Sequence, residues 1–242
     1  MTMEYDHITA LHYAAYRPSL HTEILKSHLS SKPSYTLGLD IGCGTGRSSI
    51  SLSNFCKKVI GVDPSKEMLD KSLNHSRITY KLADSNALNF DNDEFDIITF
   101  AGSLFYAKSQ AVLNETIRVA KNKCKIIIYD FEIVLEPVCK QLGLENEPTP
   151  SSNYDHQINF SGLNEQFIKL IIEQINQVKL DIEPSDLAHL LLSSKNNYAR
   201  LVHKFGITTI YDKTVKQLQA IFTNEKISLN ATTYMTSYEV IK

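Results

Sequence analysis

Residues 37–47 read LGLDIGCGTGR, an apolar run that leads directly into three glycines spaced two apart. The glycines are Gly42, Gly44 and Gly46. Because glycine has no Cβ, it adopts positive φ angles and lets a ligand approach the backbone closely. The helix after such a turn presents unpaired N–H groups to a negatively charged ligand. The stretch therefore predicts a strand, a ligand-binding turn and a helix in direct succession.

The spacing of the glycines separates two classes of nucleotide-binding turn. Dinucleotide-binding proteins carry GxGxxG, which places a glycine five residues after the first one. Here that position holds Arg47, whereas the third glycine is Gly46, four residues after Gly42. The pattern therefore argues against NAD, and a nicotinamide-dependent oxidoreductase on a similar sheet stays open as the less favoured alternative.

Two acidic residues accompany the turn. Asp63 stands about 20 residues after Gly42, at the end of the next predicted strand, where a carboxylate can accept hydrogen bonds from both ribose hydroxyls. The plainer interpretation is that Asp63 only caps the helix after Pro64. Asp40, just before the turn, can accept a hydrogen bond from an ammonium group, directly or through water. S-Adenosylmethionine carries such an amine where a dinucleotide carries phosphates.

The composition describes a globular chain of 242 residues. Hydrophobic residues make up 43% and charged residues 21% of it, which is too apolar for a disordered chain. A net charge of −2 offers no electrostatic attraction to a phosphate backbone, so nucleic acid is not expected as a partner. The four cysteines form no CxxC pair, which predicts buried free thiols and no metal site.

The N-terminus lacks the basic start and apolar run of a signal peptide, and no later apolar stretch reaches membrane-spanning length. We therefore expect a cytoplasmic protein with no membrane partner. The sequence makes no prediction about the oligomeric state.

Residues 35–133 alternate short β-branched runs with amphipathic segments of helix length, which is typical of βαβ units around a parallel sheet. Residues 49–53 alternate like a strand, but we predict a helix because only this segment can cross over between two parallel neighbours. Helices are expected after Gly46, after Pro64 and across 110–120. The predicted strands are 36–40, 58–63, 78–82, 95–100 and 125–133.

The second half of the chain changes character. Loop-forming residues cluster at 147–153, and an amphipathic helix is predicted around 165–176. A strand-like run at 178–182, two or three helices and a terminal strand at 226–240 would return the chain to the sheet. The predicted organisation is a single domain, 1–242, made of a helical cap at 1–34, a cofactor-binding core at 35–133, a lid insertion at 134–177 and a C-terminal part of the sheet and helices at 178–242.

Three segments resemble the class I S-adenosylmethionine-dependent methyltransferases. Residues 40–46 match the first motif, residues 61–69 the ribose-binding segment, and residues 83–88 the adenine-binding turn. The similarity is greatest to the small-molecule group of type 11 or trans-aconitate methyltransferase-like proteins. The resemblance implies an α/β, doubly wound, mostly parallel seven-stranded sheet, which is a Rossmann-like methyltransferase fold, with a helical lid insertion.

The resemblance also implies roles for single residues. Asp84 would accept a hydrogen bond from the adenine amino group, Ser85 would offer its N–H to the ring, and Ala101 would border the methionine part. Tyr13 and Arg17 resemble the segment that folds over the cofactor. The plainer interpretation of Asp84 is that it forms a turn, and that of Arg17 is that it lies on the surface at the end of a helix. The predicted cofactor-binding residues are Tyr13, Arg17, Asp40, Gly42, Gly44, Gly46, Asp63, Asp84, Ser85 and Ala101.

Methyl transfer from a sulfonium is an in-line displacement, which positioning can accelerate without a protein nucleophile. The resemblance therefore predicts transfer to a small molecule, through an oxygen atom or a carboxylate, and leaves the catalytic residues unknown. A catalytically silent S-adenosylmethionine-binding module stays open as an alternative. Only His156 among the acceptor-side candidates has an unperturbed pKa near neutrality. Those candidates are Ser103, Tyr106, Glu132, Tyr154 and His156.

Overall fold

The structure is a computed structural model that describes residues 11–12, 15–16, 18, 20–29, 34–144 and 153–242. Tyr13 and Arg17 lie outside these residues, so their roles stay predictions. The chain divides into two compact units. The sheet unit comprises Ser19–Glu132, Tyr154–Asn176 and Thr233–Lys242, and the helical unit comprises Met1–Pro18, Ile133–Asn153 and Gln177–Thr232.

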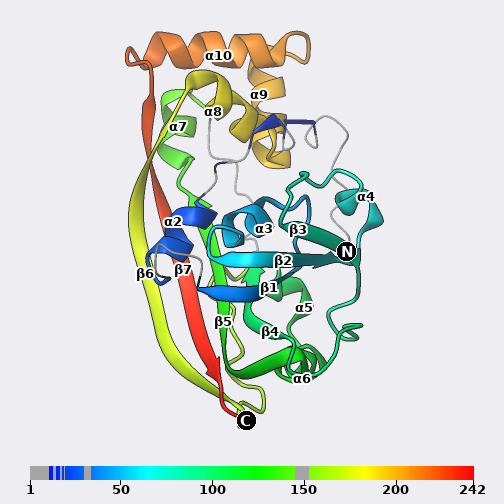
Figure 1. The fold of residues 1–242 in the computed structure, drawn as a ribbon. Helices are drawn as coiled ribbons and strands as arrows, with labels where there is room; N and C mark the ends of the chain where they lie inside the picture. The colour runs from blue at the N-terminus through cyan, green and yellow to red at the C-terminus, as the bar shows by residue number, and fades with distance from the viewer. Residues whose placement is uncertain (1–10, 13–14, 17, 19, 30–33, 145–152) are drawn as a thin grey trace. The chain divides into compact units, whose positions relative to one another are not determined.

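The described residues form a seven-stranded sheet with the strand order β3-β2-β1-β4-β5-β7-β6 (Figure 1). β1 pairs in parallel with β2 and β4, β2 with β3, and β4 with β5, whereas β7 is antiparallel. The predicted doubly wound, mostly parallel sheet is thereby confirmed. The strands are β1 Tyr35–Ile41, β2 Cys56–Asp63, β3 Ile78–Leu82, β4 Phe95–Ala101, β5 Ala120–Ile133, β6 Ile168–Ile182 and β7 Ile227–Val240.

Short helices connect the parallel strands of the sheet unit. Most of the strand-like alternation at 49–53 lies within a helix, as predicted, which ends at Leu52, and Ser49 of this helix contacts Asp40 of β1. Serine side chains accept hydrogen bonds at two helix starts, where Ser65 caps α4 and Ser109 caps α6. These helices are α3 Arg47–Leu52, α4 Lys66–Leu69, α5 Leu104–Ala107 and α6 Gln110–Val119, and a further helix, α2 His21–Lys26, precedes β1.

The helix predicted around 165–176 is wrong, because residues 168–176 belong to strand β6, which continues through the strand predicted at 178–182. Ile168, Ile172 and Ile175 satisfy a helical spacing, but the segment is rich in β-branched residues, which favour a strand once a neighbouring strand pairs with it. From Ile172 to Leu180 the half-buried positions are mainly even-numbered, as the two-residue period of a strand requires.

The helical unit has its own apolar core. Buried Val138, Leu187, Leu201 and Leu218 come from four different helices, including the helices predicted before the terminal strand. None of the described helices is both long and apolar enough to cross a membrane. The division of the chain into cap, core, lid and C-terminal part stays a prediction. The helices are α7 Glu136–Gln141, α8 Pro184–Leu192, α9 Lys195–Phe205 and α10 Ile210–Ile221.

Candidate active site

The glycine turn connects β1 to α3. Gly42, Gly44 and Gly46 have φ angles of 73°, 54° and 85°, which side chains other than glycine rarely adopt. A Cβ added at Gly42 would collide with Ser103, and one at Gly46 would collide with the Tyr80 hydroxyl, whereas one at Gly44 would meet no atom within 4 Å. Packing therefore requires the outer glycines, and the backbone of Gly44 faces open space.

Asp63, the last residue of β2, is 9% exposed and connects the turn to the next helix. Its Oδ2 accepts a hydrogen bond from the N–H of Gly44 at 2.8 Å, and its Oδ1 accepts one from the N–H of Ser65 at 2.9 Å. The contact with Ser65 agrees with the capping interpretation. An ionised carboxylate has about four acceptor positions, so two further hydrogen bonds can be accepted.

Asp40 is 0% exposed and lies beneath the turn. Ser48 and Ser49 donate hydrogen bonds to its Oδ2, each at 2.6 Å, and Thr99 donates one to Oδ1 at 2.9 Å. Burial raises the pKa of Asp40, and the three hydroxyl donors oppose this rise. The hydrogen bonds of Asp40 thus join β1, β4 and α3. The predicted contact of Asp40 with a ligand stays a prediction.

The predicted adenine-binding turn follows β3. Asp84 is exposed, and its Oδ1 accepts hydrogen bonds from the backbone and side-chain N–H groups of Asn86, both at 2.8 Å. These bonds lower the pKa of Asp84. The geometry is the one expected of a turn former. Ser85 is partly exposed beside it, and Ala101 is partly exposed at the end of β4.

Asp130, near the end of β5, was missed by sequence reasoning, and it forms a cluster with two predicted acceptor-side candidates, Tyr154 and His156. Its Oδ2 lies 2.7 Å from Nδ1 of His156 and accepts a hydrogen bond from the Tyr154 hydroxyl at 2.9 Å. Its Oδ1 accepts the N–H of Phe131 at 2.8 Å. The hydrogen bond to Asp130 raises the pKa of His156 and outweighs the opposing effect of burial. The imidazole also stacks on Tyr234, with ring centroids 5.4 Å apart.

The other acceptor-side candidates lie around this cluster with differing exposure. The ring centroid of Tyr106 is 5.8 Å from that of Tyr154, but Tyr106 is 72% exposed. Glu132 is exposed on β5, beyond Asp130. The hydroxyl of Ser103 donates to the Ile41 carbonyl, which holds Ser103 against the glycine turn.

The glycine turn, Asp63, Ala101 and Asp130 all lie at or near the carboxyl ends of the parallel strands β1, β2, β4 and β5. The strand order reverses between β1 and β4. In open α/β sheets, ligands bind beyond the carboxyl ends of the strands at such a reversal. Asp130 follows the apolar run 126–129 directly, so its position near the carboxyl end of a predicted strand is the sequence signal that could have identified it.

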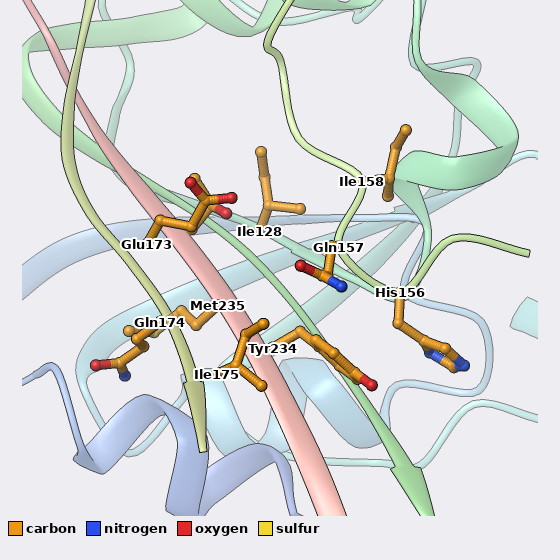
Figure 2. Close-up of a pocket in the computed structure, with 10 residues that line it drawn as sticks. Ile128, His156, Gln157, Ile158, Glu173, Gln174, Ile175, Tyr234 and Met235 are labelled. Atoms are coloured by element: carbon orange, nitrogen blue, oxygen red, sulfur yellow. The ribbon is translucent and has the colours of Figure 1, made fainter.

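A small cavity borders this region in the sheet unit. Its volume is about 10 Å³, which is room for one water molecule and excludes a metabolite or nucleoside. Figure 2 shows the side chain of His156 at the edge of the set, directed away from Glu173. The lining residues are Ile128, His156, Gln157, Ile158, Glu173, Gln174, Ile175, Tyr234, Met235 and Thr236.

The glycine turn itself fits a nucleoside with a charged tail. A side chain at Gly44 would fill the open space before the turn, and Asp63 has acceptor positions left for hydroxyl groups. Both features belong to one strand–turn–helix unit and the strand beside it. They are the features expected of a nucleotide-binding α/β protein of the kind that the sequence resembles.

Comparison with known proteins identifies the class more closely. Residues 39–123 match the family model "Methyltransferase domain". A segment of 83 residues is 40% identical to CRG1 of Saccharomyces cerevisiae, a probable S-adenosylmethionine-dependent methyltransferase, and covers 31% of this chain and 28% of CRG1. A segment of 108 residues is 31% identical to demethylmenaquinone methyltransferase of Clavibacter sepedonicus and covers 43% of this chain and 44% of that protein.

A solved structure of a candidate type II methyltransferase from Anaeromyxobacter dehalogenans has a TM-score of 0.65 at 16% identity, over 93% of this chain and 98% of that chain. This likeness shows the fold alone. The matched segments span less than half the length of the first curated relatives. Over residues 39–123 the resemblance to S-adenosylmethionine-dependent methyltransferases is confirmed, and S-adenosylmethionine is the methyl donor that this family implies.

Proposed function

We propose that the chain transfers a methyl group from S-adenosylmethionine to a small-molecule acceptor, through an oxygen atom of a hydroxyl or carboxylate. The observation that carries the proposal is the turn around Gly44, whose backbone is open to a ligand and is held in place by Asp63. Both residues lie inside the segment that matches the methyltransferase family.

Different residues bind different parts of the donor. The open backbone at Gly44 takes the methionine part, which Ala101 borders, and Asp63 accepts the ribose hydroxyls. Asp84 and Ser85 face the adenine. The bound donor supplies a methyl group on a positively charged sulfur, which leaves as a neutral thioether. The chain contributes mainly by fixing the donor and the acceptor in line, which replaces a bimolecular encounter by a positioned one.

Three observations support a small acceptor. The net charge of −2 gives no general attraction to nucleic acid. The Clavibacter relative is named for demethylmenaquinone, a small molecule. The polar groups beside the glycine turn on its β4 and β5 side, Ser103 and the Asp130 cluster, include the oxygen and nitrogen atoms that can orient such an acceptor.

We expect Asp63→Ala to weaken the binding of S-adenosylhomocysteine by roughly 10–100-fold, because hydrogen bonds to a charged acceptor each contribute about 1.5–3 kcal/mol. The N–H groups of Gly44 and Ser65 also lose their acceptor, so a modest fall in melting temperature is expected. Calorimetry on the folded variant measures the affinity. Asp70→Ala is the matched control, since among the described residues the side chain of Asp70 pairs with exposed Lys66 on α4. An unchanged dissociation constant for Asp63→Ala would remove Asp63 from the site.

Turnover distinguishes an enzyme from a binding module. The chain is incubated with methyl-labelled S-adenosylmethionine and a panel of metabolites that carry hydroxyl, carboxylate or amine groups. Label transfer to a hydroxyl or carboxylate compound is the expected result. Binding of S-adenosylhomocysteine without transfer to any compound would indicate a silent module, and binding of NADH in its place would indicate an oxidoreductase.

A further inference from the structure

Asp130 and His156 form a fixed pair. The carboxylate of Asp130 accepts hydrogen bonds from the N–H of Phe131 and the hydroxyl of Tyr154. It also accepts one from Nδ1 of His156, at a distance of 2.7 Å. Because an ionised carboxylate can only accept, the neutral imidazole carries its proton on Nδ1. Nδ1 makes the only hydrogen bond of this ring with the described residues, so Nε2 is the nitrogen that can accept a proton.

Two consecutive residues connect this pair to the glycine turn. The Tyr154 hydroxyl lies 3.0 Å from the Gly102 carbonyl oxygen, and a Cβ at Gly102 would lie 3.2 Å from Oδ1 of Asp130. The next residue, Ser103, packs against Gly42. The pair therefore stands at the same edge of the sheet as the donor site. Figure 2 shows the imidazole at the edge of the residues that line the small cavity, directed away from Glu173.

The charged groups around His156 are carboxylates. Asp130, Glu132 and Asp155 all favour the protonated imidazole, while Tyr154 and Tyr234 contribute aromatic rings. The pKa of His156 is therefore raised above the 6.5 of an unperturbed histidine, mainly by the hydrogen bond to Asp130. The neutral form that can act as a base becomes populated as the pH rises through this raised value. A general base works best when its pKa is near the working pH.

We propose that His156, positioned by Asp130, is the base that deprotonates a hydroxyl of the acceptor, and that the acceptor is a weakly acidic hydroxyl compound, a phenol or an enol. This inference rests on the proposed function and narrows it. Nε2 takes the hydroxyl proton while the oxygen forms its bond to the methyl carbon, and the electron pair of the broken carbon–sulfur bond stays on sulfur. The imidazolium then returns the proton to water.

The same charges disfavour a carboxylate acceptor. A carboxylate is already ionised at neutral pH and needs no base. It would also approach Asp130, Glu132 and Asp155, which are repulsive neighbours for an anion. A neutral hydroxyl enters without that repulsion, and it develops negative charge only beside the imidazolium that its own proton creates.

The first test needs no acceptor. The imidazole of His156 is titrated by nuclear magnetic resonance in the full chain with S-adenosylhomocysteine present. We expect a midpoint above 6.5, and a lower midpoint in Asp130→Asn, because the variant removes the carboxylate that stabilises the imidazolium. The exposed His203 of α9 is the control histidine. A midpoint unaffected by Asp130→Asn would overturn the role of Asp130.

The second test measures turnover of methyl-labelled S-adenosylmethionine with phenols, enols and carboxylates of similar size between pH 6 and 9. Hydroxyl compounds should be methylated at a rate that rises with pH, and Asp130→Asn should move this rise to lower pH. His156→Gln should reduce kcat by roughly 100–10,000-fold, the usual contribution of a general base, with unchanged affinity for S-adenosylhomocysteine. His203→Gln is the matched control and should keep full turnover.

Two outcomes would overturn the inference while the proposed function stands: methylation of carboxylates alone, or full kcat in His156→Gln. A wild-type chain that fails to bind S-adenosylhomocysteine, or that binds it and methylates no compound, overturns the proposed function instead. Binding by the folded His156→Gln variant separates a chemical effect from misfolding.

Discussion

Replacing Gly44 by valine is expected to weaken the binding of S-adenosylhomocysteine by roughly 100-fold or more, a loss of about 2.7 kcal/mol or more of binding free energy. A Cβ at this position meets no protein atom within 4 Å, so the valine side chain enters the space in front of the turn rather than the core. The φ angle of 54° is unfavourable for a β-branched residue and should cost about 1–3 kcal/mol of stability. Calorimetry gives the affinity, and thermal melts with and without ligand give the stability.

The chain offers matched controls for this substitution. Gly162 has a φ of 84° and no atom within 4 Å of an added Cβ, so Gly162→Val imposes comparable strain in the loop before β6, outside the turn. It should keep the affinity for S-adenosylhomocysteine. Gly46→Ala should lower the melting temperature with or without ligand, because its Cβ meets Tyr80. A ligand-induced stabilisation that survives in Gly44→Val would contradict the assignment of the turn.

The geometry of the glycine turn could be predicted because its signals are local, while the binding of a donor there stays a prediction. The positive φ angles at Gly42, Gly44 and Gly46 are a property of one strand–turn–helix unit, and the following strand carries Asp63. Periodicity alone could not assign β6, since Ile168, Ile172 and Ile175 have a helical spacing, and only pairing with another strand makes the segment a strand.

The acceptor half could not be assembled from sequence because it joins distant segments. Asp130 contacts Tyr154 and His156, which are 24 and 26 residues further along the chain. Each of these side chains alone is an ordinary surface or loop residue. Their combination depends on where the loop before β6 meets β5, and no periodic pattern in the sequence specifies that position.

The surroundings of Asp40 in the structure differ from those that its position in the sequence suggests. Its place before the glycine turn suggests a ligand contact, but in the structure Ser48, Ser49 and Thr99 surround its carboxylate. The serines that gave 49–53 a strand-like alternation are in part the donors of this junction. The polar spacing therefore reflects a buried hydrogen-bond network on a helix, which a period-based interpretation does not distinguish from a strand.

We expect Asp40→Ala to lower the free energy of unfolding by about 2–4 kcal/mol, because the buried hydroxyls of Ser48, Ser49 and Thr99 lose their acceptor. Urea denaturation measures this change. Asp40→Asn keeps the shape and one oxygen acceptor, so it should retain more stability than the alanine variant and provides a measurement if Asp40→Ala does not fold.

The pH dependence gives a second readout for Asp40. Burial raises its pKa, so its stabilising contribution is complete below the unfolded pKa of about 3.9 and is lost as the pH rises through the raised folded value. The free energy of unfolding of the wild type should therefore fall relative to that of Asp40→Asn as the pH increases from 4. Asp96 is a control whose contribution to stability should change with pH in the opposite direction. Burial acts to raise the pKa of Asp96, but hydrogen bonds from Lys121, Leu37 and Thr36 together outweigh burial and lower it. The contribution of Asp96 to the free energy of unfolding is therefore lost as the pH falls. Parallel pH profiles for wild type and Asp40→Asn would show that the buried carboxyl carries no such cost.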